Sequence, residues 1–215
     1  CRQVEQLRAH LARSASDLVV ALGGGSVMDV AKAGAILHFS DKPATWHLAT
    51  QKVPARALPL VALPTTAGTG SEVTSTSVLT DETESVKRSI RGDAMMPKAA
   101  IVDPELTRSC PPAITAQAGM DALTQAIESF CSRHATNFTD ALAVKAIDLV
   151  YRHLVQAFRH GEDLAARAAV AEGSMLAGLA LANARLGAVH GLAHPVGGTC
   201  HLPHGLVCAI LLPAV

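Results

Sequence analysis

The sequence predicts two consecutive domains, an α/β domain over residues 1–110 and an all-helical domain over residues 111–215. Two short apolar runs, 17–22 and 58–63, each lead into a loop rich in glycine or threonine, which is typical of strands in a parallel sheet. Apolar residues with helical spacing follow the first of these loops. Beyond the prolines at 111 and 112 the chain becomes rich in alanine and leucine, which favour helices.

The first domain is predicted to follow the order strand, glycine turn, helix, strand. Residues 17–22 indicate a buried strand, and the turn Gly23-Gly24-Gly25 follows it directly. Ser26 is expected as the N-cap of a helix that runs toward Phe39. Further strands are expected at 58–63, at 74–80, where the pattern also suits a hairpin, and at 99–103.

Helices account for the predicted second domain. Long helices are expected at about 113–132, 139–160 and 163–186, and shorter ones near 188–194 and 204–212. The polar segments at 137–140 and 161–163 are expected to be the connecting turns.

Composition and charge exclude several classes of protein. Hydrophobic residues make up 49% of the 215 residues and charged residues 17%, which indicates a sizeable core and argues against intrinsic disorder. The formal net charge is zero, and no basic block or stripe is present, so neither nucleic acid nor an anionic membrane is expected as a partner. No uncharged apolar run reaches the length of a membrane span.

The five cysteines are expected to be buried free thiols in a reducing compartment, which makes the cytoplasm the expected location. No pair has the C-x-x-C spacing, and the count is odd. Cys200 and Cys208 lie among apolar residues and are interpreted as packing residues.

Two loops predict a nucleotide site. The glycines at 23–25 would let the backbone approach an anion, and the helix that follows would present free amide groups to a pyrophosphate. The second loop, 64–72, follows another apolar strand and is rich in hydroxyl groups. Tight turns without a ligand are the alternative for each loop, but two such loops at strand ends fit a nucleotide crevice better. Met28 stands where G-x-G-x-x-G needs its third glycine, and no G-K-[ST] ending occurs, so neither an ordinary Rossmann turn nor an ATPase is indicated.

A carboxylate and three histidines indicate a metal site. Asp121 lies inside an otherwise apolar helix, where an unpaired charge would be costly. His190 and His194 would share a helix face, and His204 begins the next helix. Oxygen from Asp121 with imidazole nitrogen from His190 and His204 suits Fe²⁺ or Zn²⁺. Hydrogen-bonded structural residues are the alternative, and the same ligand count also fits an O₂-dependent iron enzyme, against which the nucleotide loops argue.

Four segments resemble the iron-containing alcohol dehydrogenases, in the same order along the chain: GGGSVMDVAK (23–32), PTTAGTGSEVT (64–74), GMDAL (119–123) and VHGLAHPVGG with LPHG (189–205). The resemblance implies a dehydroquinate synthase-like fold, in which an N-terminal nucleotide-binding domain and a C-terminal helical domain enclose the active site. Members of this family are longer at both ends. The chain begins with cysteine and stops within an apolar run, so we expect a fragment with both domains incomplete.

The resemblance also implies roles for individual residues. The expected cofactor, NAD or NADP, would contact eight residues: Gly24, Gly25, Ser26, Thr65, Thr66, Thr74, Lys87 and Leu106. Asp121, His190 and His204 match metal ligands of the family, and His194 matches the histidine beside the substrate, here the candidate for proton relay. The implied reaction is hydride transfer between a nicotinamide and a small alcohol or carbonyl compound, assisted by Fe²⁺ or Zn²⁺. Assembly of identical chains stays open.

One position departs from the family pattern. The family has Asp-Ala-Leu-Thr-His, with the histidine as a ligand, whereas this chain has Gln125 there. Three outcomes are open: weak ligation by the Gln125 amide oxygen, a water in its place, or poor metal binding. A metal-independent reductase resembling the maleylacetate reductases, a zinc-dependent polyol dehydrogenase and a non-catalytic nucleotide-binding relative are therefore the alternative functions.

Overall fold

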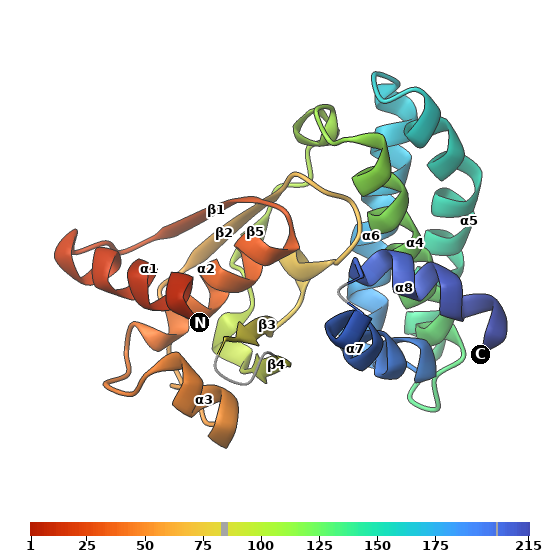
Figure 1. Cartoon of the computed structure of the whole chain (residues 1–215). Helices are drawn as coiled ribbons and strands as arrows, with labels where there is room; N and C mark the ends of the chain where they lie inside the picture. Colours follow the sequence, from red (N-terminus) through yellow and green to blue (C-terminus); the bar gives the residue numbers. More distant parts are fainter. Residues whose placement is uncertain (83–85, 201) are drawn as a thin grey trace. The chain divides into compact units, whose positions relative to one another are not determined.

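The computed structural model describes residues 1–82, 86–200 and 202–215, with the side chain of His194 also outside the described part. The chain divides into two compact units (Figure 1). Unit 1 comprises residues 1–64 and 71–101, and unit 2 comprises residues 65–70 and 102–215. The sequence-based boundary between residues 110 and 111 therefore falls inside unit 2, to which the loop 65–70 also belongs.

Unit 1 contains a parallel sheet in the order β1-β2-β5, which is the predicted α/β arrangement. The strands are β1 (Val19–Gly23), β2 (Leu60–Pro64) and β5 (Ala99–Ala100). The helices are α1 (Arg2–Arg13), α2 (Gly25–Leu37) and α3 (Ala44–Thr50), of which α2 packs on β1 and β2. Short 3₁₀ turns, η1 (Ser71–Val73) and η2 (Asp93–Met95), complete this unit. The predicted strand at 99–103 is thus confirmed only for its first two residues.

The turn between β1 and α2 differs in detail from the expectation. Gly24, rather than Ser26, is the N-cap, and the helix begins at Gly25. Gly23 has a φ of +158°, and a Cβ atom there would lie 2.7 Å from Cβ of Val27. The chain can enter the helix this early because no side chain stands in the turn. The expected strand–glycine–helix sequence is confirmed, with the helix starting closer to the strand.

The expectation of a fully buried β1 is wrong for one of its two faces. Val19 and Ala21 are buried, in a core that includes Met28 of α2. Val20 and Leu22 are 61% and 56% exposed, because among the described residues no element covers the other face. Within this chain, the apolar run at 17–22 is therefore buried on one face of the strand and exposed on the other.

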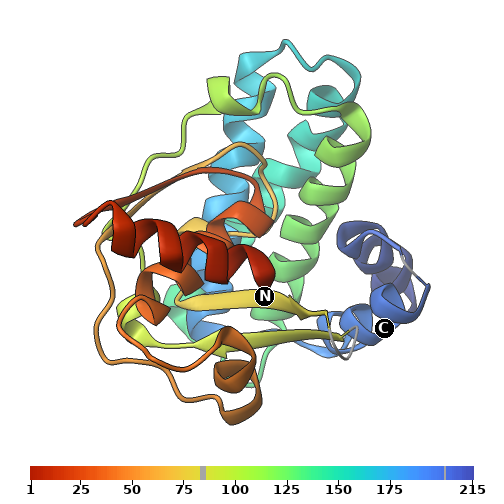
Figure 2. The ribbon, with the colours of Figure 1, turned by 60° about the vertical axis from the view of Figure 1, so that its left-hand side comes forward.

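The strand predicted at 74–80 is confirmed, and it belongs to a hairpin whose second strand, at 86–91, the sequence did not predict. β3 (Thr76–Asp81) pairs antiparallel with β4 (Val86–Arg91), and the two strands lie side by side in Figure 2. Buried Lys32 of α2 supports the entry to this hairpin, because its Nζ donates to the carbonyl oxygens of Ser71 (2.9 Å) and Thr76. Burial lowers the pKa of Lys32, and the carboxylate of Asp29, 3.5 Å from its Nζ, works against that shift.

Unit 2 is helical, as predicted. Its core lies between α4 (Pro112–Phe130), α5 (Asn137–Arg159) and α6 (Leu164–Ala184), which pack on one another through alanine, valine and leucine side chains. A Thr136–Thr139 capping box begins α5, and Asp163 caps α6 through the amide of Ala166. The remaining elements are α7 (Ala188–Cys200), α8 (His204–Leu211), η3 (Pro104–Thr107) and η4 (Leu212–Ala214).

Two helices of unit 2, α7 and α6, have unusual compositions. The helix expected at 188–194 continues through Pro195 to Cys200 as α7, so the proline does not end it. Because proline has no N–H, the carbonyl oxygen of Gly191 lacks its helical hydrogen bond from residue 195. Gly191 is exposed, so the loss of this bond is tolerated. By length and composition α6 would be able to cross a membrane, but half of its apolar window is buried within the protein. The packing of α6 against α4 and α5 accounts for its apolar composition.

Candidate metal centre

The centre of unit 2 contains a carboxylate on α4. Asp121 is only 4% exposed, and Gln125 follows one helical turn later on the same buried face of the helix. Their burial is unusual for polar residues and requires partners. Asp121 finds its partners on α7 and α8.

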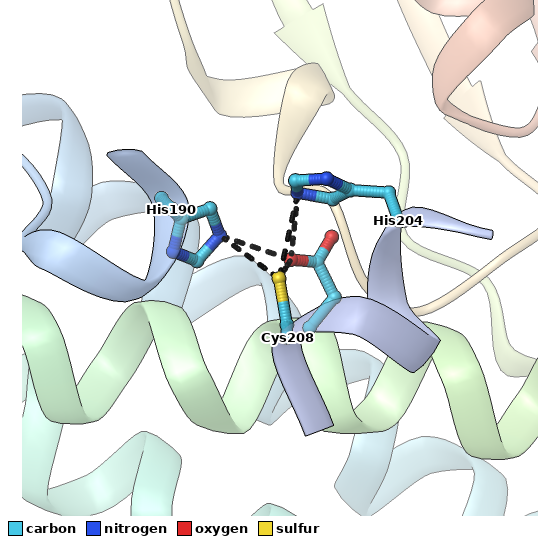
Figure 3. A group of neighbouring side chains, drawn as sticks. His190, His204 and Cys208 are labelled. Carbon is cyan, nitrogen blue, oxygen red and sulfur yellow. Dashed lines mark hydrogen bonds and ion pairs between the residues drawn. The ribbon is translucent and has the colours of Figure 1, made fainter. Parts of the chain in front are cut away.

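His190 of α7 and His204 of α8 converge on Asp121. Nε2 of His190 lies 3.1 Å from Oδ1 of Asp121, and Nε2 of His204 lies 3.6 Å from the same oxygen. The rings face one another in a tilted arrangement with centroids 5.4 Å apart (Figure 3). The structure thus brings together the three residues that were expected to hold a metal, although Asp121 lies 69 positions before His190 in the chain.

Cys208 packs in an apolar core, as expected, and it also joins this cluster of polar residues, which the sequence analysis did not foresee. Its Sγ lies 3.7 Å from Nε2 of His204 and 3.8 Å from Oδ1 of Asp121 (Figure 3). The four donor atoms of Asp121, His190, His204 and Cys208 all lie within 4.8 Å of one another. His204 and Cys208 are four residues apart on one helix, a spacing that would have revealed their shared face.

Glu128 is a second residue that the sequence analysis missed. Its carboxylate accepts a hydrogen bond from Nδ1 of His190 and another, of 2.7 Å, from the amide of Val189. A proton held at Nδ1 leaves Nε2 of His190 directed at Asp121, the orientation that a metal-ligating histidine needs. Glu128 lies two helical turns after Asp121 on α4, so helical spacing could have placed it on the same face.

The electrostatic surroundings favour a cation between these residues. Burial lowers the pKa of His190, but its hydrogen bonds to Asp121, Cys208 and Glu128 raise that pKa much further, to about 11. Burial would raise the pKa of Glu128, but the bonds from His190 and Val189 bring it below the usual value. Burial raises the pKa of the Cys208 thiol. Two carboxylates that hold a proton this firmly on His190 would also stabilise a divalent cation.

The donor set fits Fe²⁺ or Zn²⁺. Carboxylate oxygen and imidazole nitrogen are common ligands of both ions. Oε1 of Gln125 is buried and accepts no hydrogen bond from the part of the chain that the structure describes. A buried amide oxygen without a donor is costly, and a nearby cation would relieve that cost. Together these observations make the residues suitable for a metal.

Glu128 provides a test of this arrangement. We expect Glu128→Gln to weaken metal affinity by roughly 10- to 100-fold, because His190 would lose the carboxylate that orients it. Metal affinity measured by competition with a chelating dye checks this. Glu172→Gln, an exposed position on α6, is the matched control and should leave the affinity unchanged. Equal affinities for the two variants would contradict the role of Glu128.

Several residues expected at the cofactor lie in unit 1. Gly24 and Gly25 begin α2, where the first amide groups have no acceptor within the helix, and Ser26 is exposed there. Thr74 is buried, with Oγ1 3.3 Å from Nζ of Lys32, and exposed Lys87 lies in β4. The register pairs Gly23 with Pro64, so the two loops expected to bind the cofactor begin at the same end of neighbouring parallel strands.

The remaining expected site residues lie in unit 2. Thr65 and Thr66 follow β2 and are half-buried, and half-buried Leu106 belongs to η3. His194 lies within α7, but its side chain is outside the described residues, so its role as a proton relay stays a prediction.

Family profiles match nearly the whole chain. Residues 1–104 match the family described as "Iron-containing alcohol dehydrogenase", and residues 115–215 match "Fe-containing alcohol dehydrogenase family, C-terminal". The chain is 43% identical over 215 residues to "Probable alcohol dehydrogenase EutG" of Escherichia coli (strain K12), covering 100% of this chain and 53% of that protein. It is 46% identical to "Long-chain-alcohol dehydrogenase 1" of Geobacillus thermodenitrificans, covering 93% and 51%. The chain spans about half the length of the curated relatives it matches.

Solved structures share the fold. Sulfoacetaldehyde reductase from Bifidobacterium kashiwanohense, solved in complex with NAD⁺, has a TM-score of 0.95 and 41% identity, covering 98% of this chain and 56% of that one. Alcohol dehydrogenase from Oenococcus oeni has a TM-score of 0.93 and 36% identity, covering 98% and 55%. The α/β unit followed by a helical unit is therefore confirmed as the fold.

Proposed function

This chain belongs to the iron-containing alcohol dehydrogenase family, and from that premise we propose that its protein interconverts a small alcohol and the corresponding carbonyl compound with NAD or NADP. The convergence of Asp121, His190 and His204, whose donor atoms lie within 4.8 Å of one another, carries the proposal. The relatives named as alcohol dehydrogenases and as a sulfoacetaldehyde reductase support the reaction class. All five cysteines are free thiols, which favours a reducing compartment, consistent with the cytoplasm. Of the five only Cys208 is buried, so the expected burial is wrong for the others.

The metal, when bound, would supply a Lewis acid at the oxygen of the alcohol or carbonyl group. Asp121, His190 and His204 would hold it, and Glu128 would keep the Nδ1 proton of His190 in place. The nicotinamide, when bound, would supply the hydride acceptor for the carbinol carbon in the oxidation direction, and the hydroxyl proton would have to leave the site. We assign the transfer of that proton toward solvent to His194, because an imidazole titrates in the required range.

The loop that precedes α2 would bind the cofactor pyrophosphate. Gly24 and Gly25 bring backbone amides to the start of a helix, where the helix dipole favours an anion. The hydroxyls of Thr65 and Thr66, in the loop after the neighbouring strand, would add hydrogen bonds to the cofactor.

Gly24→Val tests this loop. The valine side chain would fill the space that the pyrophosphate needs. We expect KM for NAD(P)H to rise at least tenfold, because the loss of one charge-assisted hydrogen bond has about that effect. Steady-state kinetics and cofactor titration measure the change. Metal content should stay unchanged, because Asp121, His190 and His204 all lie in unit 2. A KM equal to that of the wild type would mean that this loop does not contact the cofactor.

A metal-independent reductase is the second candidate, and Gln125 is the observation that favours it. The deciding experiment follows oxidation of NADH and NADPH with a panel of small aldehydes, before chelation, after chelation and after reloading with Fe²⁺ or Zn²⁺. Loss and recovery of turnover support the metal-assisted reaction. Turnover that survives chelation supports the metal-independent one, and no turnover with any aldehyde or metal contradicts both.

A further inference from the structure

The position of the Cys208 sulfur agrees with that of a metal ligand. Tetrahedral Zn²⁺, with bonds of about 2.3 Å to sulfur and about 2.0 Å to nitrogen or oxygen, places the sulfur roughly 3.6 Å from each of the other ligand atoms. Sγ of Cys208 lies 3.7, 3.8 and 4.0 Å from the donor atoms of His204, Asp121 and His190. The same geometry separates nitrogen and oxygen ligands by roughly 3.3 Å, and the two histidine nitrogens lie 3.1 and 3.6 Å from Oδ1 of Asp121.

The surroundings of Cys208 also suit a ligand. The residue is fully buried, and α8 places it one turn after His204, so both side chains leave the helix on the same face. Val189, Ala193 and Val207 pack around it, which keeps water away and holds the side chain in one position. Gln125, at the position of the expected histidine ligand, offers only a neutral amide oxygen, which is a weaker donor to Zn²⁺ than a thiolate.

We propose that Cys208 is the fourth protein ligand of the metal and that the site therefore selects Zn²⁺ over Fe²⁺. This rests on the proposed function, because it concerns the same metal, at which the substrate oxygen would enter as a fifth donor. On coordination the sulfur forms a bond to the cation and the thiol proton leaves to solvent. The two negative ligands, Asp121 and Cys208, then balance the charge of the divalent ion in a buried site. A soft thiolate beside two imidazoles is a ligand set that favours Zn²⁺.

X-ray absorption at the zinc edge tests the proposal on the purified protein loaded with Zn²⁺. We expect a shell of one sulfur at about 2.3 Å beside nitrogen and oxygen. Cys208→Ala should remove the sulfur shell and weaken Zn²⁺ affinity by roughly 100-fold, the share of one ligand among four. The preference for Zn²⁺ over Fe²⁺, measured by competition, should shrink in this variant. Cys131→Ser, at an exposed cysteine of the same unit, should leave all three measurements unchanged.

The outcomes separate this proposal from the proposed function. A wild-type spectrum that shows only nitrogen and oxygen ligands overturns ligation by Cys208. This result needs no variant, so it stands even if Cys208→Ala folds poorly. If that metal still depends on Asp121 and supports turnover, the proposed function stands. A protein that binds no Zn²⁺ overturns the proposal, and aldehyde reduction by that protein would support the metal-independent reductase instead.

Discussion

Asp121→Asn is expected to strip the metal from the protein and to lower kcat/KM by roughly a thousandfold or more, since a Lewis acid contributes several kcal/mol to such a reaction. The amide keeps the shape of the side chain but removes the negative charge that faces His190 and His204. Metal content, measured on the purified protein, and steady-state rates with an aldehyde substrate check the expectation.

Asp148→Asn is the matched control, because Asp148 lies on the surface of α5, paired with Arg152. This substitution should change neither metal content nor rate. His204→Ala is a second variant at the centre, and its side chain is 26% exposed, so its removal should disturb packing less than a change at Asp121. Full metal content and full activity in Asp121→Asn and His204→Ala would refute the ligand assignment.

Gly205→Ala is expected to lower the free energy of unfolding by about 1–3 kcal/mol and to weaken metal binding as well. A Cβ atom at Gly205 would lie 2.0 Å from the carbonyl oxygen of Gln117 and 2.6 Å from its carbonyl carbon. These are backbone atoms of α4, which cannot rotate away, so α8 would have to move. His204 and Cys208 lie on α8 and would move with it, away from Asp121 on α4.

Gly198→Ala is the matched control, because a Cβ atom at Gly198 of α7 would meet nothing within 4 Å. Alanine is the better helix former, so this variant should be neutral or slightly more stable. Chemical denaturation and metal titration of both variants make the comparison. Equal stability of the two would mean that α8 does not approach α4 as closely as the structure shows.

Local sequence patterns predicted most of the elements. Apolar periodicity and capping residues located α4, α5 and α6, and the alternation of strands with glycine loops located β1 and β2. The threonine, serine and valine content located β3 but not its partner β4. Details that depend on neighbours were missed. Ser26 is a good N-cap by itself, but the three glycines allow α2 to start earlier. Pro195 would end an isolated helix, yet α7 continues through it.

Sequence alone identified three residues of the candidate site, because Asp121, His190 and His204 are polar residues in apolar or glycine-rich helical segments, where they need partners. Only the tertiary structure decided what stands around them. Cys208 and Glu128 look ordinary in their own helices, and they meet His190 only because α4, α7 and α8 pack together. Helical spacing reports which residues share a face, whereas the element opposite that face is chosen by packing between residues that lie 18 and 62 positions apart in the chain.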